Sequence, residues 1–433
     1  MQNSWLILNK IWTGRIANEW GINHLQMKKW QLFAYLQIKS MAQSLTDIVF
    51  VVSEGRNLKL QTLHLHEVED ILYGACIYGT GGGGSLEEGL KLVRKLYEAG
   101  KQVTIAALDE IQDHWLVASP YYVGSVAPPS KEVSERLENL ATNKENVSTI
   151  AARMLQKHQN ERIQAVIATE LGGNTAWAIE TAVNLGVPLI DADPAGRAVP
   201  DLAHTTFNIF DVSITPFSLA NKYGDTLVVE TVANHNQAEQ IARSFATISG
   251  NFAGVCDHPI KGEVLKKTVI PGTLSQAQRV GRARRLANDQ QTSPVDAIIS
   301  AGGGKLLIEG TVSNASWADI GGFIEGSITV ESITSDSEIP SLSIWFRNEY
   351  MIAKSGETIL SIIPELIIVL DKETGMPILN PNCITGMEVA IGTFPAPKVW
   401  ESDKGLSIFG PEYIGLDRDV YFAVRKEGRN LEI

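Results

Sequence analysis

Three carboxylates follow two predicted strands and carry the clearest chemistry in this chain. Glu170 comes after the apolar run Ile163–Thr169, and Asp191 and Asp193 come after Val187–Ile190. Because parallel strands bring their carboxyl ends to one edge of a sheet, we expect these side chains in one crevice. Crowded carboxylates raise the pKa of at least one member, which suits a general base near neutral pH. The three are therefore candidate catalytic residues.

The same carboxylates could instead hold a divalent metal ion, with Asp191 and Asp193 as candidate ligands. Gly172, Gly173 and Asn174 follow Glu170, and Arg197 follows the second strand, so these four are candidate substrate-binding residues. The competing interpretation is that Asp191 or Asp193 only caps a loop and that Arg197 neutralises the charge.

A glycine-rich loop, Gly79-Thr-Gly-Gly-Gly-Gly84, separates two predicted helices. Its spacing matches the dinucleotide fingerprint, but that motif needs a preceding strand, and the periodicity before Gly79 is helical. Ser85 followed by Glu88 is typical of a capping box at the start of the second helix. Consecutive glycines allow backbone N–H groups to face an anion or a developing oxyanion, so Gly81, Gly82, Gly83 and Gly84 are candidate substrate contacts. The alternative is a tight helix–helix connection.

Two further side chains lie close to these groups in the sequence. His204 follows the acidic segment closely but is typical of a structural histidine. Cys76 precedes the glycine loop and is interpreted as a small buried side chain. The cysteines Cys76, Cys256 and Cys383 are far apart in the sequence, which fits a reducing compartment.

The chain length and the order of predicted strands and helices indicate two domains. A chain of 433 residues exceeds one ordinary core. Residues 62–295 alternate predicted strands and helices, as in an α/β domain, and residues 296–405 read as short strands with turns, as in a small sandwich or barrel. Residues 1–61 are an extension of uncertain structure, to which we assign no function.

Charge and hydropathy limit the partners. The formal net charge of −12 argues against nucleic acid and against anionic membranes. No run reaches the roughly 18 apolar residues needed to span a bilayer. We therefore expect a cytoplasmic protein that acts on a small molecule.

Several blocks resemble one family. "EVEDILYGACIYGTGGGG" (Glu67–Gly84), "ELGGNTAWAIETAVNLGVPLIDADPAGRAVPDL" (Glu170–Leu202), "WFRNEYMIA", "PELIIVLDKETGMPI" and "GTFPAPKVW" are similar to the S-methyl-thiohydantoin desulfurase-like family, formerly an uncharacterised group associated with hydantoin utilisation. The resemblance covers roughly residues 62–424. It implies a three-layer α/β/α N-terminal domain with a β-rich, barrel-like C-terminal domain, and a final segment, 406–433, that completes the first domain. It also implies removal of sulfur as a thiol from a hydantoin-like ring.

The leading hypothesis is hydrolytic loss of a thiol from S-methyl-thiohydantoin or a related five-membered ring, with Glu170 or Asp191 activating water. The first alternative is a hydantoinase- or oxoprolinase-type cyclic amidohydrolase or its accessory subunit. The second is a non-catalytic nucleotide- or metabolite-binding module that uses the glycine loop. A homo-oligomer or a hydantoinase-type partner subunit is compatible with the first two.

Overall fold

The computed structural model describes residues 59–124, 128–334 and 337–430. The extension predicted for residues 1–61 therefore lies outside the described residues up to position 58. In the part that is described, no helix is both long and apolar enough to cross a membrane.

A mixed sheet forms the first domain, with strand order β1-β2-β5-β4-β3-β8-β6-β7 and with β9 paired to β5. Its centre is parallel, because β2, β5, β4 and β3 run in one direction, while β1, β8, β6 and β7 are antiparallel to their neighbours. The strands are β1 (Leu60–Leu63), β2 (Val103–Ala107), β3 (Leu116–Gly124), β4 (Ile163–Val166), β5 (Leu189–Asp193), β6 (Phe217–Ala220), β7 (Thr226–Val229), β8 (Phe252–Lys261) and β9 (Ile270–Pro271).

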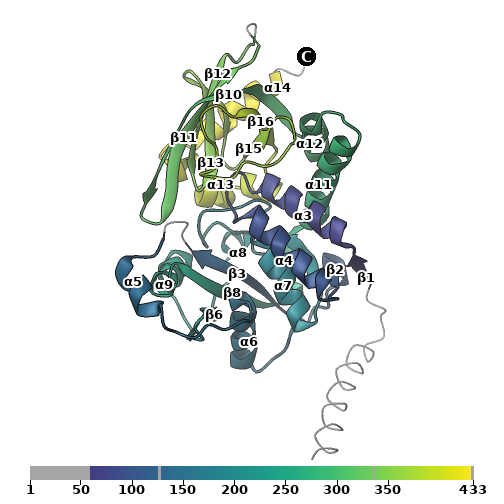
Figure 1. The fold of residues 1–433 in the computed structure, drawn as a ribbon, viewed down its shortest axis with the longest axis vertical. Helices are drawn as coiled ribbons and strands as arrows, with labels where there is room; N and C mark the ends of the chain where they lie inside the picture. Colours follow the sequence, from purple (N-terminus) through teal and green to yellow (C-terminus); the bar gives the residue numbers. More distant parts are fainter. Residues whose placement is uncertain (1–58, 125–127, 335–336, 431–433) are drawn as a thin grey trace, which may run out of the picture. The chain divides into compact units, whose positions relative to one another are not determined.

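Helices cover both faces of this sheet, since alternate strand residues point to opposite sides. On β8, Cys256 joins the core shared with α3, α4, α6 and α7, whereas Val255 joins a separate core with α9. The three-layer α/β/α expectation is confirmed (Figure 1). The helical elements here are α3 (Leu65–Tyr78), α4 (Leu86–Glu98), η1 (Leu108–Glu110), α5 (Lys131–Leu137), α6 (Val147–Gln159), α7 (Thr175–Leu185), α8 (Thr206–Ile209), α9 (His235–Ile248) and α10 (Gly262–Thr268).

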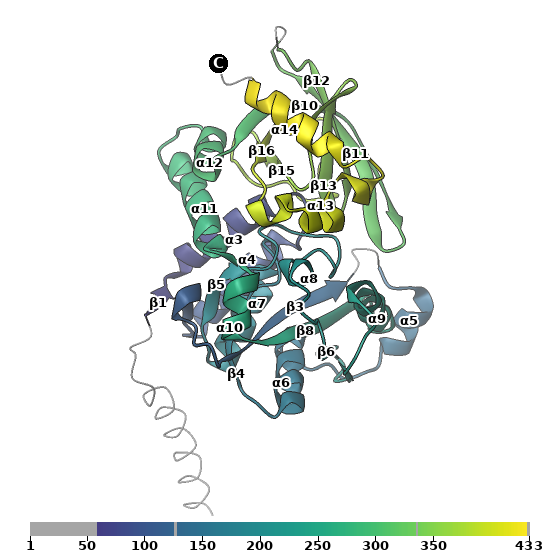
Figure 2. The same cartoon turned by 180° about the vertical axis from the view of Figure 1, so that it is seen from behind.

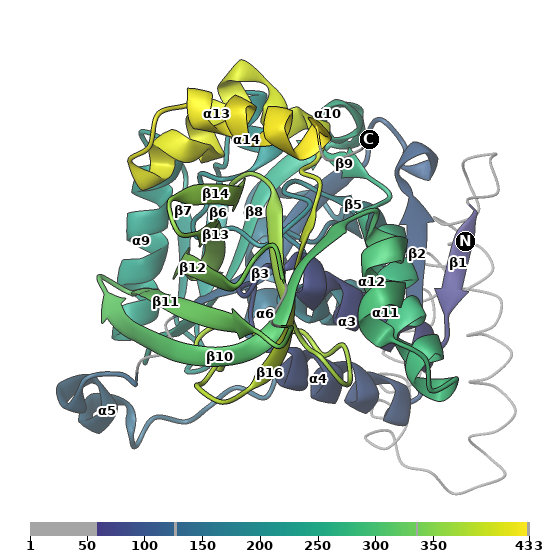
Figure 3. The same ribbon diagram turned by 90° about the horizontal axis from the view of Figure 1, so that it is seen from above.

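The second sheet is antiparallel throughout, with order β14-β13-β12-β11-β10-β16-β15. It curls into a half-barrel around an apolar core, which confirms the β-rich, barrel-like expectation (Figure 3). Its strands are β10 (Lys305–Ile320), β11 (Phe323–Ser332), β12 (Ser341–Arg347), β13 (Glu349–Ser355), β14 (Thr358–Ile362), β15 (Leu366–Asp371) and β16 (Glu388–Phe394).

Helices α11 (Thr273–Asp289) and α12 (Pro294–Gly302) connect the two sheets, and α11 packs along α3. Glycines permit this close approach, because a Cβ on Gly74 would lie 1.8 Å from the Ala277 carbonyl oxygen and one on Gly281 would lie 1.9 Å from that of Asp70. The buried Asp70 carboxylate accepts two hydrogen bonds from Arg285, at 2.9 and 2.7 Å. The contact holds α3 and the loop after it in place.

The C-terminal segment contacts elements of both domains. It consists of η2 (Lys398–Glu401), α13 (Asp403–Phe409), η3 (Pro411–Ile414) and α14 (Asp419–Asn430). Its core residues pack with Ile209 of α8 and with Ile352 of β13. Figure 2 shows α13 beside α8. Trp400 Nε1 also donates to the Ala195 carbonyl at 2.7 Å. The segment therefore supports the loop after β5 from behind.

Candidate active site

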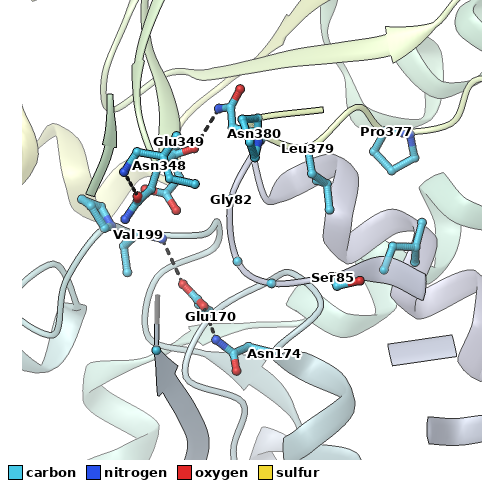
Figure 4. Close-up of a pocket in the computed structure, with 18 of the residues that line it drawn as sticks. Gly82, Ser85, Glu170, Asn174, Val199, Asn348, Glu349, Pro377, Leu379 and Asn380 are labelled. Atoms are coloured by element: carbon cyan, nitrogen blue, oxygen red, sulfur yellow. Dashed lines mark hydrogen bonds between the residues drawn. The ribbon is translucent and has the colours of Figure 1, made fainter. Parts of the chain in front are cut away.

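A cleft of about 1110 Å³ lies between loops of the α/β sheet and loops of the half-barrel. The α/β side contributes the glycine loop, the first turns of α4, the end of β3 and the segment after β4. The half-barrel side contributes the turn between β12 and β13 and the loop after β15. Polar lining residues at its centre are Glu170, Asn174, Asn348, Glu349 and Asn380 (Figure 4).

Glu170 is held by both of its carboxylate oxygens. Oε1 accepts from Asn174 Nδ2 at 2.9 Å, and Oε2 accepts from the Val199 N–H at 3.0 Å. Burial raises the pKa of Glu170 to about 7, although these two hydrogen bonds act to lower it. The charges of Asp193 and Glu239 raise the pKa further. A carboxyl with this pKa can act as a base at neutral pH.

Glu349 is another buried carboxyl in the cleft, and sequence reasoning missed it. Burial raises its pKa well above the ordinary value, the charge of Glu170 raises it further, and Arg197 lowers it. Within the described residues its Oε2 atom is buried without a hydrogen-bond partner. The surroundings of Glu349 therefore favour its protonated form. Pairs of carboxyls with separated pKa values are typical of acid and base roles.

The glycine loop runs between these two carboxyls. A Cβ on Gly82 would lie 1.9 Å from Glu349 Oε1, so only glycine leaves room for that carboxyl. Two backbone hydrogen bonds attach the loop to the half-barrel. The Tyr350 N–H donates to the Thr80 carbonyl at 2.7 Å, and the Asn380 N–H donates to the Gly81 carbonyl at 2.8 Å. Of the predicted capping box, the Ser85 half is present, since Ser85 Oγ accepts from the Glu88 N–H at 3.3 Å.

The segment after β4 lies against this loop, backbone to backbone. A Cβ on Gly172 would meet the Gly83 carbonyl oxygen at 2.5 Å, one on Gly173 would meet the Gly84 carbonyl carbon at 2.5 Å, and Asn174 N–H donates to the Gly83 carbonyl at 2.8 Å. Gly172 and Gly173 do not line the cleft, whereas Asn174 and the loop glycines do. The two predicted groups of residues are thus brought together.

Asp191 and Asp193 lie away from the cleft. The strand expected at Val187–Ile190 is shifted, so both aspartates belong to β5 rather than to the loop beyond it. Asp191 accepts from Ser275 N–H at 2.9 Å and from Ser275 Oγ at 2.5 Å, at the start of α11. Asp193 Oδ1 accepts from the N–H groups of Ala195 and Gly196, both at 2.6 Å, which shapes its own loop.

Arg197 also has internal partners. Its guanidinium donates to the carbonyls of Ala198, Pro364 and Glu365 and to Thr80 Oγ1, and it is fully buried over the Phe409 ring. Burial lowers its pKa to about 10, although the Glu349 and Glu365 charges act to raise it. Arg197 joins the first domain to the half-barrel and lies outside the cleft lining.

The residues do not fit the metal site expected at Asp191 and Asp193. Among the described residues, no three His, Cys, Asp or Glu side chains gather in a way that could hold a metal ion. Both oxygens of Asp191 are already bonded to Ser275. We therefore derive no catalytic step through a metal.

The two remaining candidates, His204 and Cys76, have surroundings typical of structural side chains. His204 is buried, 3.0 Å from Asp201 Oδ1 and between the rings of Phe409 and Tyr413. Burial and the Glu170 charge raise the pKa of the Cys76 thiol to about 12, so it carries no thiolate near neutral pH.

Comparison with known proteins identifies the family. Residues 66–231 match the family model described as S-Me-THD-like, N-terminal domain, and residues 233–422 match S-Me-THD-like, C-terminal domain. The chain belongs to the S-Me-THD-like family. Together the two matches cover most of the chain, including every polar residue at the centre of the cleft. The match confirms the family resemblance of the sequence blocks.

A solved structure shares the S-Me-THD-like fold seen here. It is the crystal structure of a protein from Chromobacterium violaceum, with 23% identity and a TM-score of 0.66, covering 82% of this chain and 98% of the other. At this identity the likeness concerns the fold alone. No curated protein matches the chain.

Proposed function

We propose that this chain hydrolyses the carbon–sulfur bond of an S-methyl-thiohydantoin, releasing methanethiol and leaving the hydantoin. Membership of the S-Me-THD-like family supports the substrate class. The observation that carries the proposal is the pair of buried carboxyls on either side of the glycine loop. The pKa of Glu170 is raised to about 7, and burial raises the pKa of Glu349 well above its ordinary value.

In the first step, the Glu170 carboxylate takes a proton from water as the water oxygen bonds to the ring carbon that bears sulfur. Glu349 donates its proton to the adjacent ring nitrogen, which becomes N–H. The result is a neutral tetrahedral intermediate. Acid and base catalysis together avoid a free hydroxide and a ring anion.

In the second step, the Glu349 carboxylate takes the proton of the new hydroxyl and a carbonyl forms. The carbon–sulfur bond breaks, and Glu170 gives its proton to the departing sulfur. Water has supplied one oxygen to carbon, one hydrogen to nitrogen and one to sulfur. Both carboxyls have returned to their starting state.

The remaining polar groups position these reactants. Asn174 donates to Glu170 and accepts from the Tyr122 N–H at 3.3 Å, so it orients the base. The Gly82 N–H donates to the Gly79 carbonyl at 2.8 Å, whereas in the described part of the chain we find no acceptor for the N–H groups of Gly81, Gly83 and Gly84. These N–H groups would hold a carbonyl oxygen of the ring.

The test is turnover of S-methyl-thiohydantoins by the purified full chain in ¹⁸O-labelled water. We expect methanethiol, detected with a thiol reagent, and one ¹⁸O in the hydantoin carbonyl, detected by mass spectrometry. Ring opening without thiol would instead favour the cyclic amidohydrolase. A parallel reaction with a chelator tests the metal alternative, and we expect no loss of rate there.

A further inference from the structure

The glycine loop contains one residue that is not glycine, and the backbone of that residue is strained. Thr80 has a φ of +48°, in the left-handed region that glycine adopts freely and β-branched residues avoid. Its side chain is buried. Residues held in this region cluster at functional sites, where surrounding contacts keep the strained conformation in place. We therefore looked for a contact of the Thr80 side chain that glycine could not make.

That contact is a hydrogen bond from Arg197. Its Nη2 donates to the Thr80 hydroxyl oxygen at 3.0 Å, and both side chains are buried. The other acceptors of the guanidinium are the backbone carbonyl oxygens of Ala198, Pro364 and Glu365. A buried guanidinium has lost its hydration, so a donor nitrogen without an acceptor is strongly unfavourable. The Thr80 hydroxyl supplies the acceptor for Nη2, and Arg197 in turn holds Thr80.

Arg197 also connects the glycine loop to the segment that carries the proposed base. Its backbone carbonyl accepts from the Leu171 N–H at 3.2 Å, directly after Glu170 in the chain. The Val199 N–H, two residues after Arg197, donates to Glu170 Oε2 at 3.0 Å. Through the Pro364 carbonyl the same guanidinium reaches the half-barrel. One side chain thereby fixes the loop relative to the base and to the half-barrel.

The position of the loop matters because three of its N–H groups are free for a ligand. Within the described residues, the N–H groups of Gly81, Gly83 and Gly84 have no acceptor, and all three glycines line the cleft. The Thr80 carbonyl accepts from the Tyr350 N–H at 2.7 Å. In a trans peptide the C=O and the following N–H point in opposite directions, so the Gly81 N–H points away from Tyr350. The conformation of Thr80 therefore sets the direction of the first free N–H group.

We propose that Thr80 and Arg197 are positioning residues, and that the hydrogen bond between their side chains holds the glycine loop in the conformation in which its three free N–H groups bind a carbonyl oxygen of the ring. This rests on the proposed function, whose site it extends. Neither side chain lines the cleft, so both act through the loop. The ring carbonyl is present in substrate and product alike, so loss of the hydrogen bond raises KM more than it lowers kcat.

The test replaces Thr80 by valine, which has the same shape without the hydroxyl, and by serine, which keeps the hydroxyl. We expect Thr80→Val to raise KM for S-methyl-thiohydantoin about tenfold and to keep kcat within about threefold of the wild type, since a hydrogen bond to a charged group is lost. Thr80→Ser is the matched control and should keep both constants near the wild-type values. Equal KM values in Thr80→Val and Thr80→Ser would overturn the proposal.

Thr80→Gly separates the hydroxyl from the strained backbone. Glycine adopts the left-handed φ without strain, so a role limited to backbone shape predicts wild-type kinetics for this variant. The positioning role predicts the same rise in KM as in Thr80→Val, because the acceptor for Arg197 is lost in both. Thr80→Gly also replaces Thr80→Val as the test if the valine variant does not fold. A wild-type KM in Thr80→Gly would refute the positioning role.

A measurement without turnover keeps this proposal apart from the proposed function. The amides of Thr80 and Gly82 donate to the carbonyls of Ile77 and Gly79, at 3.3 and 2.8 Å. Hydrogen exchange of residues 79–84, followed by mass spectrometry, should be about tenfold faster in Thr80→Val than in the wild type and Thr80→Ser. If this difference appears and no chain releases methanethiol, the proposed function fails and the positioning of the loop stands. Equal exchange in the three proteins overturns the positioning role, whatever the turnover.

Discussion

Replacing Gly82 by alanine places one methyl group against the proposed acid. The Cβ would lie 1.9 Å from Glu349 Oε1 and 2.6 Å from its carboxyl carbon, so the carboxyl must retreat by about 1 Å. Glu349 has a long side chain that can change rotamer, and Gly82 itself is not at a positive φ, although its neighbours Gly81 and Gly83 are. The substitution therefore displaces the acid without a large cost to folding.

The expected loss follows from that displacement. A misplacement of about 1 Å at a reacting group costs about a hundredfold in rate, or about 2.7 kcal/mol of barrier. We expect kcat for methanethiol release to fall by about this factor in Gly82→Ala, while the melting temperature stays within a few degrees of the wild type.

Gly89→Ala is the matched control. It adds the same methyl group nearby, inside α4, where the nearest atom is Ala176 Cβ at 3.2 Å and alanine is the better helix former. We expect its kcat within about threefold of the wild type. Wild-type turnover in Gly82→Ala would refute the role of Glu349.

Three further outcomes are expected. Glu349→Gln, which keeps the shape and removes the acidic proton, should lower kcat by about 10²- to 10⁴-fold without lowering the melting temperature, as followed by thiol release and thermal unfolding. Folding raises the pKa of Glu170 from 4.5 to about 7, so protonated Glu170 stabilises the folded state, and this stabilisation is lost as pH rises through 7. In urea titrations, the free energy of unfolding of the wild type should therefore fall by about 2 kcal/mol relative to Glu170→Gln between about pH 5.5 and 8.5. An equal pH dependence in the two proteins would contradict the assigned pKa. Gly281→Val, whose Cβ would lie 1.9 Å from the Asp70 carbonyl oxygen, should destabilise the protein by about 2 kcal/mol or more, measured by the same titration.

The sequence predicted the layers correctly, and it placed Glu170 at the edge of the sheet. The alternating pattern around residues 163–190 gave the βαβ unit that places Glu170 at the sheet edge, and the helical periodicity before Gly79 excluded a dinucleotide loop. Those features are local, since each depends on the period of neighbouring residues.

What the sequence could not give depends on distant contacts. A shift of the strand by about two residues put Asp191 and Asp193 inside β5, where Ser275 of a later helix binds one of them. Glu349 begins β13 of the half-barrel, almost 180 positions after Glu170, and only the folded chain brings it to Gly82. An acid placed directly before the apolar run Tyr350–Ala353 in "WFRNEYMIA" was the one sequence signal for it.

The most direct test of the account is the pH dependence of methanethiol release by Glu170→Gln. The wild-type rate should rise as pH passes through about 7, where Glu170 becomes a carboxylate. The variant should lose about 10²- to 10⁴-fold in kcat together with that rise, while Glu263→Gln, an exposed change on α10, should keep both. A variant that retained wild-type turnover and the same pH profile would show that Glu170 is not the base.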